Sequence, residues 1–84
     1  LEEGQLYIYQ EIDDWLTVNY TATQGETIQL RLHDITGKLL YEENSSLSSG
    51  QNLMRLPLKD FPKGVYVLSI QANTWAKHQQ FIKE

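Results

Sequence analysis

Two histidines are the side chains of this sequence best suited to move a proton at neutral pH. Nucleophilic catalysis would place one of them beside a serine or a cysteine. His33 is out of phase with the apolar residues Leu30 and Leu32, so its side chain is predicted to face solvent. His78 lies in a polar run, and the chain has neither a Gly-x-Ser-x-Gly elbow nor a glycine-rich phosphate loop. The sequence therefore predicts no catalytic residue, and the protein is not expected to be an enzyme.

Acidic side chains gather between residues 11 and 14. Glu11, Asp13 and Asp14 are close in sequence, and Asp34 lies in another expected loop. Carboxylate oxygens are the ligands that calcium prefers, but this spacing does not match an EF-hand. A solvated acidic turn is the favoured interpretation, so neither a metal nor a cofactor is predicted. Paired acids for glycoside hydrolysis would also need a cleft, which so small a chain hardly supplies.

Four aromatic residues are not clearly in phase with the expected core: Tyr7, Tyr9, Trp15 and Trp75. An aromatic strip on a sheet face binds sugar rings or a protein partner. The other interpretation, which we favour, is that Trp15 packs across a sheet edge and Trp75 closes the final hairpin. Both interpretations stay open at the level of sequence.

The overall composition limits the partners of the chain. The 84 residues suffice for one domain, and they include no cysteine, so neither a disulfide nor a thiolate metal site is available. The net charge is −4 and there is no basic stripe, which argues against nucleic acid and against an anionic membrane surface. No apolar run approaches the roughly 20 residues of a transmembrane segment. Because the chain begins with Leu1 and shows no signal peptide, it is expected to be part of a longer protein.

Short strands are expected to position these side chains, because apolar residues recur with a period of two. Leu16, Val18 and Tyr20 are an example, and no segment has the pattern of an amphipathic helix. Seven strands are predicted, over residues 5–9, 15–22, 27–33, 38–43, 52–58, 64–72 and 76–83. With turn signals about every ten residues, this predicts an all-β fold. The fold would be a single seven-stranded antiparallel immunoglobulin-like β-sandwich domain over residues 1–84, with Greek-key links.

The predicted connections contain residues that favour turns. Gly25 is expected to take a positive φ in a hairpin, and Asp34 is expected to cap the turn that ends at Gly37. Pro62 and Gly64 predict a tight connection. The serine-rich stretch 44–50 is predicted to be the most flexible loop, and residues 72–75 form the last turn.

The strand phases also predict the core. Phe61 is expected to close one end of it. The residues placed inside are Leu16, Val18, Ile28, Leu30, Leu32, Leu39, Tyr41, Leu56, Leu58, Tyr66, Leu68 and Ile70.

Three motifs in order resemble the C-terminal sorting domain of the type IX secretion (Por secretion) system. The first is an apolar strand followed by Asp-x-x-Gly-Lys and a second apolar strand. The second is an apolar residue followed by Pro-x-Gly-x-Tyr, and the third is an apolar terminus that contains lysine. They are carried by Asp34, Gly37 and Lys38, by Pro62, Gly64 and Tyr66, and by Phe81, Ile82 and Lys83. The likeness spans residues 15–84, although the Pro-Asn-Pro segment with which the family usually opens is replaced by residues 9–14.

This resemblance implies a non-catalytic C-terminal domain that directs a larger cargo protein across the outer membrane of a Gram-negative cell. The implied partners are the outer-membrane translocon, the processing machinery and an upstream cargo domain of the same chain. The implied location is the periplasm in transit, and then the cell surface or the medium. The resemblance would place the recognition residues on the terminal strand, residues 77–84. The alternative is an accessory immunoglobulin-like module that binds carbohydrate or protein through its aromatic residues.

Overall fold

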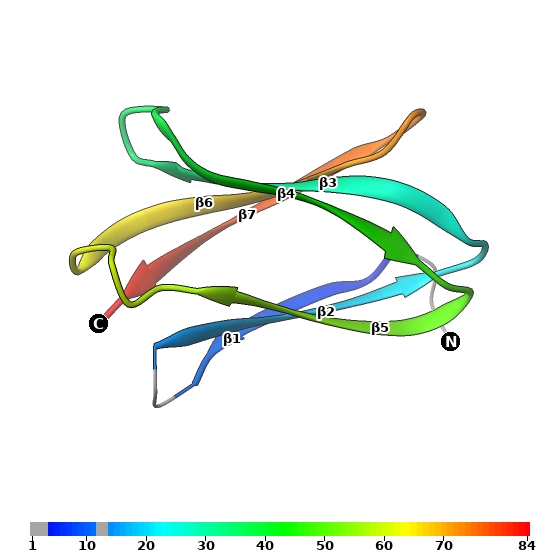
Figure 1. Ribbon diagram of the computed structural model, residues 1–84, viewed down its shortest axis with the longest axis horizontal. Helices are drawn as coiled ribbons and strands as arrows, with labels where there is room; N and C mark the ends of the chain where they lie inside the picture. The colour runs from blue at the N-terminus through cyan, green and yellow to red at the C-terminus, as the bar shows by residue number, and fades with distance from the viewer. Residues whose placement is uncertain (1–3, 12–13) are drawn as a thin grey trace. The chain divides into compact units, whose positions relative to one another are not determined.

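The structure is a computed structural model that describes residues 4–11 and 14–84, and Figure 1 shows its strands. All seven predicted strands are present. They are β1 (Leu6–Gln10), β2 (Trp15–Ala22), β3 (Glu26–Asp34), β4 (Leu39–Leu47), β5 (Gly50–Pro57), β6 (Gly64–Gln71) and β7 (Ala76–Lys83). The described residues contain no helix, and therefore none that could span a membrane. The predicted all-β sandwich is confirmed.

The strands form two sheets, which are three-stranded in the order β1-β2-β5 and four-stranded in the order β4-β3-β6-β7. The pairs β1–β2, β2–β5, β3–β6 and β6–β7 are antiparallel. Neighbours that are not consecutive, β2 with β5 and β3 with β6, show that the chain crosses over in each sheet, as expected for an immunoglobulin-like order. In the constant-type order of that fold the fourth strand joins the first sheet. Here β4 lies beside β3 instead.

The three-stranded sheet buries one face of its central strand. Leu16 and Val18 of β2 are fully buried, and Leu56 of β5 lies opposite Leu16. Thr17 and Thr21 point to the other face and are nevertheless buried, with 5% and 8% of their surface exposed. Because β2 has a neighbour on both sides, its short side chains are covered by the longer ones of β1 and β5.

The four-stranded sheet buries the alternate residues of its two central strands. Leu30 lies opposite Ile70 and Leu32 lies opposite Leu68, and all four side chains are fully buried. Each large apolar side chain buried in this way stabilises the fold by about 1.5–3 kcal/mol relative to its exposed state. These pairs fix the register, because a shift by one residue would turn every one of them to solvent.

The predicted core residues outside β4 are all buried, and Tyr20 and Ala22 of β2 are buried although they were not predicted. Leu39 is 45% exposed and Tyr41 is half-buried, because β4 is an edge strand and Leu39 begins it directly after a turn. The inward phase of β4 continues instead to Leu47, which is buried and was not predicted. Burial, reinforced by the nearby Glu43 carboxylate, raises the pKa of the Tyr41 hydroxyl. Phe61 is half-buried.

The prediction of a flexible loop over residues 44–50 is wrong. β4 runs through its serines to Leu47 and β5 begins at Gly50, so only two residues connect the strands. Asn52 holds this turn, because its side-chain oxygen accepts from the Ser48 amide at 2.9 Å and its side-chain nitrogen donates to the Ser48 carbonyl at 2.9 Å. Serine composition alone suggested a loop, whereas the alternation of exposed and covered residues continues through it.

Gly25 does not make the predicted hairpin. It links β2 to β3, which belong to different sheets, and it is not among the glycines with positive φ. A Cβ atom added at Gly25 would lie 3.3 Å from the carbonyl oxygen of Leu47, which is closer than ordinary contact. Glycine here allows a close backbone approach rather than a left-handed conformation.

Candidate functional site

The first motif is a turn capped by its own aspartate. Asp34 Oδ1 accepts hydrogen bonds from the Thr36 hydroxyl at 2.6 Å, the Thr36 amide at 2.9 Å and the Lys38 amide at 3.0 Å. The Gly37 amide donates to the Asp34 carbonyl at 3.0 Å, and the φ of Gly37 is 91°. The Thr36 hydroxyl, followed by the backbone amides and the Lys38 charge, lowers the pKa of Asp34. The predicted capped turn is therefore present, and Asp34 and Gly37 shape it.

The second motif sets the entry into β6. The Phe61 amide donates to the Leu58 carbonyl at 3.0 Å, which closes the turn before Pro62. Gly64 then begins β6 with a φ of 157°, a value that residues with a Cβ atom rarely adopt. Nothing lies within 4 Å of a Cβ atom added at Gly64. The backbone conformation, rather than a steric clash, therefore favours glycine at this position.

Tyr66 joins the second motif to the third. Its side chain is 3% exposed, and its ring lies against Phe81 of β7 with a centroid distance of 5.8 Å and an angle of 28° between the planes. The two residues face each other in the register of β6 and β7. This stacked pair attaches the terminal strand to the sheet.

The terminal strand presents its three motif residues differently. Phe81 is half-buried against Tyr66 and Lys83 is only 7% exposed, whereas Ile82 is 59% exposed. Ile82 lies opposite the half-buried Val65, so a small apolar surface forms on the outer side of this sheet. Most of β7 is exposed, and β7 is one edge of its sheet. Of the predicted terminal residues, Ile82 alone offers a large apolar side chain to solvent.

Three of the four aromatic residues proposed for ligand binding lie on the outer face of the three-stranded sheet, whereas Trp75 lies in the β6–β7 turn of the other sheet. Tyr7 and Tyr9 lie on the outer face of β1, each 54% exposed, in register with Asn19 and Thr17 of β2. Trp15 is half-buried at the start of β2. Leu53 of β5 shares the face of the tyrosines, because it lies opposite Asn19, and it is 68% exposed. The sequence did not identify Leu53 as part of this face. Leu53 and Met54 are consecutive apolar residues, so the pattern does not show which of them points outward.

Trp75 belongs to the other sheet and has a structural contact. Its indole nitrogen donates to Glu26 at 3.0 Å, and the Ala72 amide donates to the Trp75 carbonyl at 2.9 Å. It closes the β6–β7 hairpin, as the second interpretation expected. It does not join Tyr7, Tyr9 and Trp15 in one aromatic strip.

Glu11 is engaged in a polar cluster that the sequence did not predict. The Arg55 Nε atom donates to its carboxylate at 2.9 Å, and the Thr17 hydroxyl also donates to it. The Arg55 guanidinium lies over the Trp15 ring, 4.6 Å from its centroid. The Thr17 hydrogen bond, followed by Arg55, lowers the pKa of Glu11. These contacts turn Glu11 into an anchor for the start of β2.

The structure brings no metal site together among the residues it describes. Asp14 is described, whereas Asp13 lies outside the described residues. Within residues 4–11 and 14–84, no three histidine, cysteine, aspartate or glutamate side chains lie close enough to hold an ion. His33 pairs in register with Val67 on β6, and His78 pairs with Ser69, so each lies on a strand facing a residue without acid–base chemistry.

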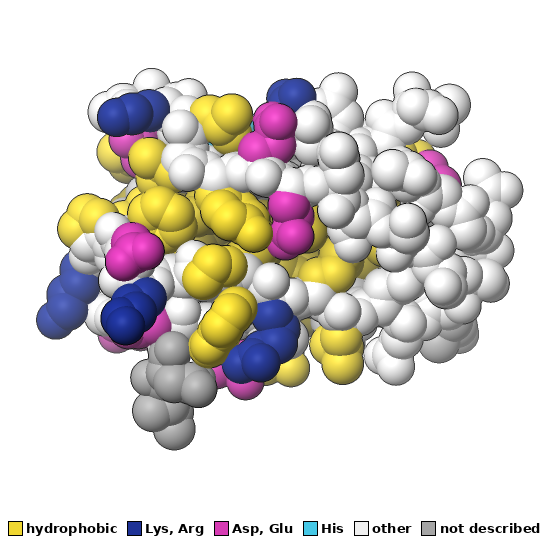
Figure 2. Space-filling model, viewed as in Figure 1, with side chains coloured by type: hydrophobic (Ala, Val, Ile, Leu, Met, Phe, Trp, Pro, Cys, Tyr) yellow, Lys and Arg dark blue, Asp and Glu magenta, His cyan; other side chains and the backbone are white. Residues whose placement is uncertain are grey.

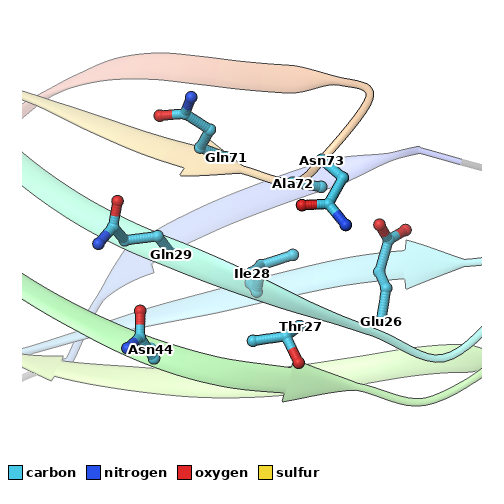
Figure 3. A pocket seen from close by; sticks show the side chains of 8 residues that line it. All are labelled: Glu26, Thr27, Ile28, Gln29, Asn44, Gln71, Ala72 and Asn73. Carbon is cyan, nitrogen blue, oxygen red and sulfur yellow. The ribbon is translucent and has the colours of Figure 1, made fainter.

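A shallow polar pocket lies at one end of the four-stranded sheet, with a volume of about 470 Å³ (Figure 3). Its residues come from β3, β4 and the β6–β7 turn: Glu26, Thr27, Ile28, Gln29, Asn44, Gln71, Ala72 and Asn73. The one carboxylate among them, Glu26, accepts the Trp75 hydrogen bond. Amide side chains beside a single carboxylate that already accepts a hydrogen bond, with no nucleophile paired to it, do not make a catalytic arrangement.

Charge points to no further site on the face of the described residues that Figure 2 shows. Figure 2 shows basic and acidic side chains interspersed on the face in view, without a patch of one sign. One ion pair joins opposite charges on neighbouring strands: the Nε atom of Arg31 on β3 lies 3.0 Å from Oε2 of Glu42 on β4. Surface pairs of this kind contribute little to stability, at most about 1 kcal/mol.

Fold and motifs together define a small immunoglobulin-like β-sandwich module whose motif residues form turns and a stacked core pair. Residues 12–84 match the protein family described as the secretion system C-terminal sorting domain. The chain belongs to this family, and the resemblance drawn from the three motifs is confirmed. A comparison with curated proteins finds no match.

Family membership establishes the general function. The chain is a non-catalytic sorting domain of the type IX secretion system and directs the secretion of its cargo. Such a domain interacts with the type IX machinery and is attached to a cargo protein that is secreted or held at the cell surface. The matched region begins at residue 12, so β1 (Leu6–Gln10) precedes it.

Proposed function

We propose that residues 1–84 form the C-terminal domain of a larger exported protein and that the export machinery recognises the exposed side of β7 around Ile82. The cargo precedes the domain in the same chain. It passes through the periplasm, and the domain then docks on the outer-membrane translocon, where the processing machinery acts. Family membership supports the sorting role, and the exposure of the terminal residues supports the place of recognition.

The observation that carries the recognition proposal is the contrast within the terminal motif. Phe81 and Lys83 point to the covered side of the sheet, whereas Ile82 is 59% exposed. A receptor contacts the side chains that a folded domain presents to solvent, and apolar anchors contribute most to such contacts. Ile82 extends the apolar side chains of Val65 and Val67 across the sheet. We name the outer surface formed by Val65, Val67, Gln80 and Ile82 the terminal surface.

The remaining motif residues support the fold that presents this surface. Asp34 and Gly37 shape one turn, Pro62 and Gly64 shape another, and Tyr66 stacks on Phe81. Loss of any of them is expected to act on export through stability. Lys38 is exposed beside its turn and is available for a direct contact.

The test compares two exposed apolar residues in a reporter fused to the chain, behind an inner-membrane signal peptide. Ile82→Lys is expected to reduce export in a host with the type IX machinery. The matched control Leu53→Lys, at a residue that is 68% exposed on the other sheet, is expected to leave export unchanged. Circular dichroism of both variants checks the fold. Equal export of the two folded variants would contradict the role of the terminal surface.

Point substitutions are preferable to removal of the terminus. Deleting residues 79–84 strips Phe81 from its stack on Tyr66 and removes the buried Lys83. Full burial of a phenylalanine contributes about 1.5–3 kcal/mol, so loss of the half-buried Phe81 together with the rest of the strand destabilises a marginal domain. A deletion would therefore not separate recognition from stability.

A further inference from the structure

The two sheets have four edge strands, and β1 differs from the other three. An edge strand exposes backbone groups that pair with another strand, and proteins protect such edges with charges or proline. β4, β5 and β7 carry such residues: Glu42 and Glu43, Arg55 and Pro57, Lys77 and Lys83. β1 reads Leu-Tyr-Ile-Tyr-Gln and carries none.

The backbone of β1 alternates between its neighbour and the open edge. The Thr21 amide donates to the Gln5 carbonyl at 3.1 Å, and the Glu11 amide donates to the Trp15 carbonyl at 2.7 Å. Because bonded positions alternate in an antiparallel pair, Tyr7 and Tyr9 also bond β2. Ile8 therefore directs its backbone N–H and C=O to the side of β1 where the described residues place no strand.

The sequence of β1 is self-complementary about Ile8. We propose that β1 of a second copy of this chain pairs with β1 in the antiparallel direction. The two-fold axis then passes between the two Ile8 residues. The two Ile8 residues then exchange two backbone hydrogen bonds. Tyr7 of each copy lies opposite Tyr9 of the other at the close, non-hydrogen-bonded positions. Each three-stranded sheet becomes half of a six-stranded one.

The exposure of the tyrosines and the order of the residues in β1 favour a second copy as the occupant. Tyr7 and Tyr9 are each 54% exposed, and opposed aromatic side chains are among the stabilising cross-strand pairs. An isologous contact needs a surface that complements itself, which the order Tyr-Ile-Tyr provides. Because each copy carries a net charge of −4, the dimer is expected to be weaker at low salt, where the repulsion between copies is less screened.

The test uses sedimentation of the 84-residue chain from micromolar to millimolar concentration. The chain is expected to pass from monomer to dimer, and hydrogen exchange at the Ile8 amide is expected to slow as the dimer forms. The double variant Tyr7→Lys/Tyr9→Lys places like charges opposite each other, and so does Tyr7→Glu/Tyr9→Glu. Each is expected to raise the dimer dissociation constant about tenfold or more. Both variants retain the core, because the tyrosines are on the outer face.

A mixture of the two variants identifies the surface. Lysines then face glutamates across the two-fold axis, and the mixture is expected to recover association that neither variant shows alone. Both variants keep a net negative charge, −2 and −6 after two charges are added to −4, so bulk attraction does not explain recovery. A chain that stays monomeric at millimolar concentration would overturn the proposal. So would variants that dimerise as strongly as the parent chain, or a mixture that fails to associate.

Discussion

Gly64 offers the sharpest test of how the second motif supports the fold. Its φ of 157° is rarely adopted by residues with a Cβ atom, and such a conformation costs about 1–3 kcal/mol. Since an added Cβ meets nothing within 4 Å, a substitution by alanine is penalised through the backbone alone. We therefore expect Gly64→Val to destabilise the chain by about 1–3 kcal/mol. For a domain of this size the melting temperature falls by about 4–8 °C for each kcal/mol.

The control is the mirror-image residue, introduced by chemical synthesis. D-alanine favours positive φ, so it suits the backbone conformation of Gly64. D-alanine at position 64 is expected to leave stability unchanged or to raise it by about 0.4–1 kcal/mol, because it restricts the unfolded chain. Urea unfolding followed by circular dichroism measures all the variants. If L-alanine and D-alanine give equal stability, the positive φ of Gly64 does not limit which residue fits at this position.

Three further predictions concern the core, the carboxylates and the secondary structure. Leu68→Ala is expected to lower the free energy of unfolding by about 2–5 kcal/mol, because Leu68 is fully buried. Leu53→Ala, at an exposed residue, should change it by no more than about 0.5 kcal/mol. Similar losses for the two variants in urea unfolding would refute the assigned core. The pKa values of Asp34 and Glu11 are lowered from 3.8 and 4.5, so their stabilising effect is present above those values and is lost as pH falls through the folded-state pKa values. The melting temperature should be flat above about pH 5 and fall below it, and Asp34→Asn should reduce that fall; an unchanged pH profile in the variant would contradict the capping role. Far-UV circular dichroism should show a β spectrum, and a helical content near one third, which is average for globular proteins, would contradict the fold.

The strands could be predicted because their alternation is local and regular. In β3 and β6 every second residue from Ile28 to Leu32 and from Tyr66 to Ile70 is buried, as the pattern required. The turn at Asp34 was equally predictable, since an aspartate and a glycine at this spacing specify its hydrogen bonds. Such features depend on residues that are near one another in sequence.

The errors arose where a distant part of the chain decides the outcome. Leu39 has the phase of a core residue, but it begins an edge strand and remains exposed. Gly25 resembles a hairpin residue, but its neighbour is the Leu47 carbonyl, 22 positions away along the chain. The serines before Leu47 are typical of a loop by composition. They form a strand because β4 pairs with β3, and composition does not reveal that pairing.

The motif residues could be identified from the sequence, but which of them are exposed and which are buried could not. The three motifs identified the family, yet the exposure of Ile82 beside the buried Lys83 follows from the pairing of β7 with β6. The contacts of Glu11 with Thr17 and Arg55 join three segments of the chain, and no local sequence pattern predicts them. Likewise, the face shared by Tyr7, Tyr9 and Leu53 depends on the sheet order.

The central claim is that this chain is sufficient to direct a cargo through the type IX system. The most direct measurement is the fraction of a folded reporter, fused ahead of residues 1–84 and supplied with an inner-membrane signal peptide, that reaches the cell surface or medium. We predict efficient export in a host with the translocon and retention in the periplasm of an otherwise identical host without it. Retention of the folded fusion in the periplasm of both hosts would contradict the claim.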